Sequence, residues 1–236
     1  MKISAENIDL SCVESEIYNR LLELDGQHIL ELGCGCAEIT RDIASDGVDR
    51  KITALEVDEI AHEKNLQITD LPNVTFALSG AQAIPLENES VDMAFMFKSL
   101  HHVPLNLMEP SMREIRRVLK PGGLAYISEP IFAGDFNEIL RLFHDEQKVR
   151  EAAFSIIKKV VDEGLFNLVD ETFFNSPMKF ENFTDFENKV LKVTHTNHAL
   201  DENIYSLVKQ RFEDHAGDHG AYFLMPIRVD LLQRPI

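Results

Sequence analysis

The chain has 236 residues, with 23 Lys or Arg against 40 Asp or Glu, so its formal net charge is −17. Such an acidic chain repels polyphosphate, which argues against nucleic acid as a partner. A chain of this length buries a full core, and α/β units of this size commonly form one domain. We therefore expect a single domain over residues 1–236.

The N-terminal residues and the cysteines bear on the cellular compartment. Residues 1–10 alternate charged and small apolar groups, without the cationic start and apolar run of a signal peptide. No window approaches the roughly 20 apolar residues that span a bilayer. Cys12, Cys34 and Cys36 cannot all pair in a disulfide framework, so reduced thiols are expected. These features predict a cytoplasmic protein without a membrane span, and they leave its oligomeric state undefined.

Strand and helix patterns alternate along the first half of the chain. Apolar residues at Ile17, Leu21 and Leu24 predict a short leading helix over residues 14–24. The patterns that follow predict a strand at 27–32, a helix at 37–44, a strand at 51–57, a helix at 59–68, and strands at 74–78 and 91–97. Continuous apolar strands separated by helices favour a parallel sheet that is covered on both faces.

The second half of the chain is richer in helix. Pro110 at the first helical position predicts a helix over 110–119, which a Lys-Pro-Gly-Gly run ends before a strand at 124–128. The later patterns predict one or two helices over 135–163, strands at 165–174 and 221–232, and helices at 183–193 and 202–212. This is more helix than a bare α/β core needs, so we expect residues 131–218 to contain a helical lid or substrate-recognition region.

A glycine-rich turn follows the first predicted strand, where residues 31–37 read Glu-Leu-Gly-Cys-Gly-Cys-Ala. Gly33 and Gly35 let the backbone approach a ligand closely, and the next helix offers unpaired N–H groups at its start. Many α/β proteins tolerate glycine there, so the turn alone fits an ordinary strand-to-helix connection equally well. The one-residue spacer between Cys34 and Cys36 does not match the spacing of zinc ligands.

The second predicted strand ends in an acidic residue, Glu56. It lies about 20 residues after the glycine turn, where a carboxylate can accept hydrogen bonds from both hydroxyls of a ribose. The apolar residues before it direct it to the carboxyl edge of the sheet, where such folds bind ligands. The alternative is a surface acid at a strand end.

With these features in order, residues 28–129 resemble the class I S-adenosylmethionine-dependent methyltransferases, and more narrowly the small-molecule branch of the ubiquinone and menaquinone biosynthesis enzymes. The matching motifs are residues 29–35, Glu56, residues 83–86, 90–92 and 100–103, and residues 113–123, which end in Lys-Pro-Gly-Gly. The resemblance implies a Rossmann-like α/β fold with a doubly wound, seven-stranded, mostly parallel sheet. It further implies an antiparallel last strand, a helical insertion after strand five, and S-adenosyl-L-methionine as cofactor.

The resemblance also implies the residues that bind the cofactor. They are Glu31, Gly33, Gly35, Glu56, Gly80, Ala81, Gln82 and Lys98. The first three would surround the methionine part, Glu56 would hold the ribose, and residues 80–82 would border the adenine. Lys98 and Ser99 would face the methionine end.

Three positions depart from the family pattern. Ala37 replaces the third glycine of the turn, where one methyl group adds little bulk. Gly80 stands where many relatives have an Asp that bonds the adenine amino group, so adenine recognition would rest on backbone groups or on Gln82. The stretch between His102 and the 113–123 motif is longer than the family's and contains Pro110.

The adjacent histidines His101 and His102 are the candidate catalytic residues, because a neutral imidazole can take a proton from a substrate oxygen or nitrogen. Adjacent residues on such a loop point in different directions, so at most one is expected to face the substrate. Methyl transfer does not require a base, since in-line positioning supplies much of the barrier reduction. Glu129, at the end of the fifth strand, would contact substrate or cap the next helix.

No metal site is expected from the sequence. His195 with His198, and His215 with Asp218 and His219, are histidine groups that could ligate a metal, but solvated polar residues before the last strand are the favoured interpretation. The expected partner is a small-molecule methyl acceptor, hydrophobic or aromatic. Its pocket would use some of four phenylalanines that otherwise pack in the core: Phe132, Phe136, Phe143 and Phe154.

Three other functions share some of these features. A nicotinamide-dependent oxidoreductase shares the glycines and the acid, but its fingerprint needs a small residue where this chain has Glu38. Nucleic-acid methylation predicts Asn or Asp before Pro-Pro and an aromatic residue, where residues 97–100 read Phe-Lys-Ser-Leu. A non-catalytic module that binds the cofactor or a partner stays open, since fold alone does not prove catalysis. We predict transfer of a methyl group from S-adenosylmethionine to an oxygen, nitrogen or carbon of a small molecule.

Overall fold

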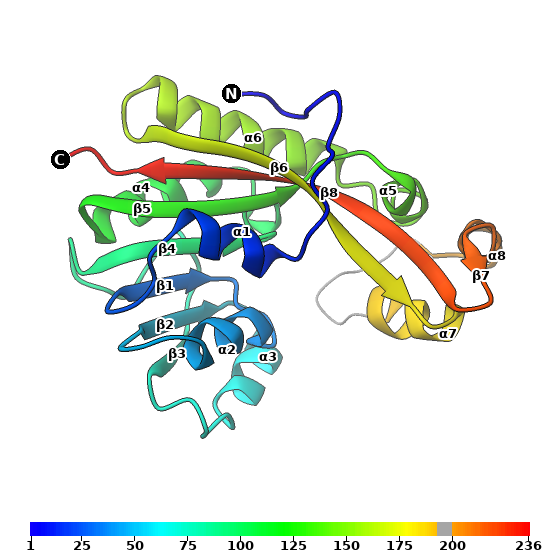
Figure 1. Ribbon diagram of the computed structural model, residues 1–236, viewed down its shortest axis with the longest axis horizontal. Coiled ribbons are helices and arrows are strands. Elements are labelled where there is room, and N and C mark those ends of the chain that lie inside the picture. The colour runs from blue at the N-terminus through cyan, green and yellow to red at the C-terminus, as the bar shows by residue number, and fades with distance from the viewer. Residues whose placement is uncertain (193–199) are drawn as a thin grey trace.

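The computed structural model of the chain describes residues 1–192 and 200–236, and it is built on one central sheet. The strands are β1 (His28–Leu32), β2 (Lys51–Glu56), β3 (Val74–Leu78), β4 (Val91–Phe97), β5 (Leu119–Pro130), β6 (Asn167–Phe180), β7 (Ala216–Gly217) and β8 (Gly220–Gln233). Their order is β3-β2-β1-β4-β5-β8-β6, and the short β7 pairs with β8 (Figure 1). Neighbours from β3 to β5 are parallel, whereas β8 is antiparallel to both β5 and β6. The predicted fold class is confirmed.

Helices cover both faces of this sheet. They are α1 (Glu14–Leu21), α2 (Glu38–Ser45), α3 (Glu59–Asn65), the 3-10 turn η1 (Leu100–His102), α4 (Met108–Val118), α5 (Asp135–Leu140), α6 (Gln147–Asp162), α7 (Phe183–Phe186), the π-helical turn η2 (Glu187–Leu191) and α8 (Glu202–Glu213). Apolar side chains of α1 and α2 pack on one face, and those of α4 and α6 pack on the other. Because both faces are covered, β1, β2 and β4 are buried almost throughout, which explains their continuous apolar sequences.

Aromatic rings fix the leading helix on its face of the sheet. Tyr18 of α1 makes edge-to-face contacts with Phe95, Phe97 and Tyr126, at centroid separations of 5.9–6.5 Å. Such pairs add roughly 0.5–1.5 kcal/mol to the free energy gained from area burial. Residues before the first strand are therefore part of the core.

Two boundaries differ from the predicted ones around α4. The helix begins at Met108, before Pro110, so the proline is its third residue. The first four N–H groups of a helix have no intrahelical acceptor, so proline at the third position removes no helical hydrogen bond. The helix ends at Val118 and β5 starts at once, which places the Lys-Pro-Gly-Gly run inside the first residues of the strand.

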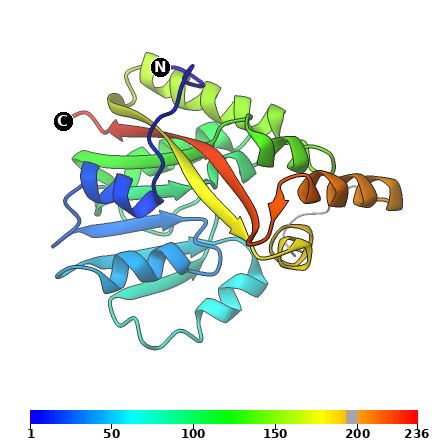
Figure 2. The same ribbon diagram turned by 45° about the vertical axis from the view of Figure 1, so that its right-hand side comes forward.

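The segment 131–218 divides between the sheet and a projecting group of helices. Helix α6 packs on the sheet. Strand β6 is the edge strand of the sheet, and it continues to Phe180, past the end predicted at residue 174. The ends of β6 and β8 project past the other strands and carry α7 and α8 (Figures 1 and 2). Around them α5, α7, η2 and α8 form a separate aromatic cluster, with members such as Phe180 and Phe212. A role for these helices as a substrate lid stays a prediction.

The predicted helix at 183–193 is shorter than expected. Helix α7 has one turn and passes into η2, which ends at Leu191, while Val193 lies outside the described residues. Nowhere in residues 1–192 and 200–236 is a helix both long and apolar enough to cross a membrane.

We predict that Gly123→Ala destabilises the protein, because an added methyl would lie 2.9 Å from the carbonyl oxygens of Asp92 and Lys120. Backbone atoms cannot move aside cheaply, and overpacking of this kind typically costs about 1–3 kcal/mol in the free energy of unfolding. Gly217→Ala is the matched control, since a methyl there would meet no atom within 4 Å. Urea unfolding measures the difference in the free energy of unfolding. Equal midpoints for the two variants would contradict a packing role for the last glycine of the Lys-Pro-Gly-Gly run.

Candidate functional site

A cavity of about 670 Å³ lies at the carboxyl ends of the parallel strands. Its walls come from the ends of four of them: residues 32–36 after β1, 56–58 after β2, 79–82 after β3 and 97–99 after β4. The volume falls in the roughly 300–1,000 Å³ range of small-molecule sites. The sheet thus brings distant parts of the sequence together around one ligand-sized space.

The glycine turn after β1 forms the floor of this cavity and is anchored to β2. The backbone N–H groups of Gly33 and Cys34 donate to the carbonyl oxygen of Leu55, at 2.8 and 3.0 Å. Gly33 has a φ of 75°, and a methyl there would lie 2.9 Å from the Cβ of Ser99. Gly35 has a φ of 55°, and a methyl there would meet no atom within 4 Å. Gly33 is therefore required by close packing, whereas Gly35 borders open space for a ligand.

Ala37, at the third position of the turn, is constrained by its backbone conformation and not by the size of its side chain. Ala37 has a φ of 60°, in the left-handed region that costs a non-glycine residue roughly 1–2 kcal/mol. Its N–H donates to the carbonyl oxygen of Cys34 at 2.9 Å, and α2 begins at the next residue. Glycine is favoured here for its backbone conformation.

The carboxylate of Glu56 is held by three backbone N–H groups. Its Oε2 accepts from Gly35 at 2.6 Å, and its Oε1 accepts from Val57 and Asp58 at 2.8 and 2.9 Å. An ionised carboxylate has about four acceptor positions, so capacity remains for a ligand hydroxyl. The side chain that was expected to hold a ribose is thus fixed between the ends of β1 and β2.

Glu31 lines the cavity, and its pKa lies well above the usual range of a glutamate. It is 2% exposed, and the Thr40 hydroxyl donates to its Oε2 at 2.6 Å. Burial raises the pKa of Glu31 to about 7, against the opposing effect of that hydrogen bond, and the nearby charge of Glu56 raises it further. Near neutral pH this side chain is poised to lose its proton when a cation arrives.

Residues 80–82 form another wall of the cavity. The Gln82 carboxamide folds over Gly80 so closely that a methyl on Gly80 would lie 2.4 Å from its Oε1. Ala81, between them, is buried in the core. The backbone of Gly80 is thus covered by the amide of Gln82.

Lys98 lines the cavity and is tied to the leading helix. Its Nζ lies 2.6 Å from Oε2 of Glu14, whose Oε1 accepts a hydrogen bond from the Tyr126 hydroxyl at 3.2 Å. Burial raises the pKa of Tyr126. Sequence reasoning missed Glu14, because an acid in the first turn of a helix is a common capping feature and nothing in its spacing pointed to Lys98.

The paired histidines take different positions. His102 is exposed and lines the cavity, whereas His101 is 4% exposed and turns into the protein. The Nδ1 of His101 lies 2.6 Å from Oε2 of Glu129, whose Oε1 accepts from the Leu100 N–H at 2.9 Å. Burial opposes protonation of His101, but the charges of Glu129 and Glu146 outweigh it and raise its pKa. Only His102 of the pair can meet a ligand in this cavity.

The four phenylalanines considered for an acceptor pocket lie elsewhere, and all four are described by the structure. Phe136 and Phe143 belong to the aromatic cluster around α5, α7 and α8. Phe154 packs under the Arg228 guanidinium at 4.6 Å, and Phe132 lines a separate cavity of about 190 Å³ together with Arg228 and Glu129. Phe136 and Phe143 are therefore core residues.

The histidine groups near the C-terminal end do not gather into a site in the described part of the chain. His195 and His198 lie outside the described residues. The ring of His215 packs against Phe223 at 5.1 Å, and its Nδ1 lies 2.9 Å from the Arg211 carbonyl oxygen.

Comparison with known proteins identifies the central part of the chain. Residues 29–123 match a family model described as a methyltransferase domain. A sterol 4-C-methyltransferase of Caenorhabditis elegans is 33% identical over 135 residues, which cover 55% of this chain and 39% of that protein. An O-methyltransferase of Pyrenophora dematioidea is 32% identical over 118 residues, which cover 48% of this chain and 43% of that protein. The chain thus spans less than half the length of these two relatives.

Solved structures share the whole fold. The YcgJ protein of Bacillus subtilis has a TM-score of 0.67 at 15% identity, over 94% of this chain and 97% of that one. A SAM-dependent methyltransferase of Methanosarcina mazei has a TM-score of 0.58 at 16% identity, over 95% of this chain and 100% of that one. At this identity the likeness concerns the fold alone. Together with the match over residues 29–123, it shows that the chain contains a methyltransferase domain with a Rossmann-like fold.

Proposed function

We propose that the chain transfers the methyl group of S-adenosylmethionine to an oxygen, nitrogen or carbon of a small-molecule acceptor. One observation supports the proposal. The eight residues expected to bind the cofactor come from the ends of four strands, and all of them line the same cavity. They are Glu31, Gly33, Gly35, Glu56, Gly80, Ala81, Gln82 and Lys98.

The residues present fit this cofactor. Open space above Gly35 admits a ligand against the backbone, and Glu56 keeps acceptor capacity for a ribose hydroxyl. Glu31 offers a carboxylate to the methionine ammonium group, and the Gln82 amide offers both donors and acceptors to the adenine edge. When bound, S-adenosylmethionine supplies a methyl group on a sulfonium, which an acceptor aligned with the sulfur–carbon bond can take up.

The acceptor is proposed to enter beside η1. His102, Val103 and Pro104 follow β4 and line the cavity there, so one polar ring stands beside apolar groups. A mostly apolar wall with few polar groups suits a hydrophobic or aromatic small molecule. The relatives named for sterol C-methylation and O-methylation support this class of acceptor. The ubiquinone and menaquinone branch and the cytoplasmic location remain parts of the proposal.

Isothermal titration calorimetry tests the cofactor assignment. We expect the protein to bind S-adenosylmethionine and its demethylated product but not NAD. Glu56→Ala should weaken binding by about 10- to 150-fold, because each lost charge-assisted hydrogen bond costs about 1.5–3 kcal/mol. Glu59→Ala, an exposed acid nearby that does not line the cavity, is the control and should bind as the unmodified protein does.

Failure of both sulfur compounds to bind at millimolar concentration would refute the proposed function. Binding that is followed by no methyl transfer to any member of a panel of sterols and phenols would instead favour a non-catalytic cofactor-binding module. The two results are separated because calorimetry needs no acceptor.

The perturbed pKa of Glu31 predicts a pH-dependent affinity. The carboxyl is largely protonated below its pKa of about 7 and ionised above it, and only the ionised form pairs with an ammonium group. Affinity should therefore rise about tenfold from about pH 6 to about pH 8, and binding near pH 7 should release a proton. Titrations in buffers of different ionisation enthalpy measure that release.

Glu31→Gln is the companion variant for this test. Its amide oxygen can still accept from Thr40, but it cannot titrate, so the rise in affinity with pH should disappear. An unmodified protein whose affinity is flat over this pH range would show that Glu31 does not contact the ammonium group.

A further inference from the structure

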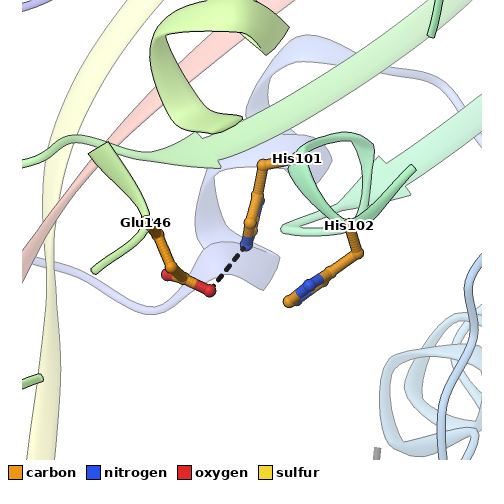
Figure 3. A group of neighbouring side chains, drawn as sticks. All are labelled: His101, His102 and Glu146. Carbon is orange, nitrogen blue, oxygen red and sulfur yellow. Dashed lines mark ion pairs between the residues drawn. The ribbon is translucent and has the colours of Figure 1, made fainter. Parts of the chain in front are cut away.

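His101, His102 and Glu146 come together beside the cofactor cavity. One ligand atom from each lies within 4.8 Å of those from the other two. The His101 ring points toward the Glu146 carboxylate, and the His102 ring lies next to them (Figure 3). The histidines come from η1 and the acid from the residue before α6, so the grouping is created by the fold.

The spacing suits a shared ion. Two ligand atoms bound to one ion at about 2.0–2.2 Å can be at most about 4.4 Å apart. Nε2 of His101 lies 3.7 Å from Oε1 of Glu146, inside that limit. The ligand atom of His102 lies within 4.8 Å of the other two, and its exposed ring has room to move closer to them.

The surroundings orient His101 and Glu146 as metal ligands are oriented. Glu129 binds Nδ1 of His101, which fixes the ring and directs Nε2 toward Glu146. A histidine ligand commonly donates its other nitrogen to a carboxylate in this way. The Arg150 guanidinium holds the other oxygen of Glu146, Oε2, at 2.5 Å, so Oε1 faces the histidines.

The charges around the cluster are compatible with a cation. Glu129 and Glu146 contribute two carboxylates, against the guanidinium of Arg150 and that of Arg228, which is itself paired with Asp230. Nε2 of His144 lies 3.0 Å from Oε1 of Glu146, so a further imidazole is within reach of an ion bound to that oxygen. Two or three imidazoles and one carboxylate suit zinc and the neighbouring divalent transition metals, with coordination positions left open.

We propose that His101, His102 and Glu146 bind a divalent transition-metal ion at the edge of the cofactor cavity. Because His102 lines the cavity, an ion bound to its ring would lie on the side of the cavity that is assigned to the acceptor. This role toward the acceptor rests on the proposed function, whereas metal binding itself does not. The histidine pair thereby gains a task that does not require either ring to act as a base.

Titration of the full chain with Co²⁺, followed by visible absorption and by equilibrium dialysis, tests the site. We expect one ion per chain, and at least tenfold weaker binding in His102→Ala and in Glu146→Gln. His219→Ala removes an exposed histidine outside the cluster, from the group near the C-terminal end, and should bind Co²⁺ as the unmodified protein does. Thermal unfolding shows whether each variant is folded. If Glu146→Gln does not fold, the test rests on His102→Ala, which changes an exposed side chain.

Three results would overturn the proposal: no stoichiometric Co²⁺ on the unmodified protein, unchanged binding in folded His102→Ala, or loss of binding in His219→Ala. Calorimetry with S-adenosylmethionine on the same samples separates this result from the proposed function. Metal binding without cofactor binding would keep the site and refute the methyltransferase activity, and the reverse would refute the site alone.

Discussion

The hydrogen bond between the Gly35 N–H and Glu56, 2.6 Å long, is the contact on which the arrangement of the cavity depends. It joins the turn after β1 to the end of β2, and two further N–H groups, from Val57 and Asp58, tie the same carboxylate to the start of α3. Three backbone N–H groups hold this carboxylate in one position. One side chain thus sets the distance between two loops and places an acceptor at the point where they meet. The left-handed backbone of Gly33 and Gly35 is the conformational counterpart: the Gly35 N–H donates to Glu56, while the Gly33 N–H donates to the Leu55 carbonyl oxygen.

Contacts with neighbouring groups divide the buried acids at this edge into different chemical types. Glu56 is surrounded by N–H donors, whereas Glu31 receives one hydroxyl in an apolar setting and titrates near neutrality. Glu129 is as deeply buried, and the adjacent His101 lowers its pKa although burial alone would raise it. Glu31 and Glu129, both buried at strand ends, therefore differ in pKa because of the charges and hydrogen-bond partners beside them. An acidic composition by itself gives no hint of this division.

The alternation of strands and helices up to Phe97 could be predicted from the sequence, because β1, β2 and β4 are buried on both faces and are mostly apolar. The cofactor residues followed from local motifs at strand ends, which parallel topology necessarily brings to one edge. Contacts made across the sequence were not predictable: Glu14 with Lys98, His101 with Glu129, and Glu146 beside both histidines. The phenylalanines after residue 131 show the same limit, since their helical spacing fits a pocket and a core equally well. Packing of α5 and α8 on the extended β6 and β8 decided that Phe136 is a core residue.

The contact of Glu14 with Lys98 and Tyr126 has a consequence for where the functional unit begins. The domain match starts at residue 29, yet the acid that neutralises a lysine in the cavity wall comes from a helix that precedes it. Without that helix, the buried hydroxyl of Tyr126 would lose its acceptor and Lys98 would present an uncompensated positive charge beside a sulfonium cofactor. The leading helix thus supplies a charge that pairs with Lys98 at the cavity, in addition to its packing on the sheet. Family boundaries drawn from sequence motifs alone would leave it out.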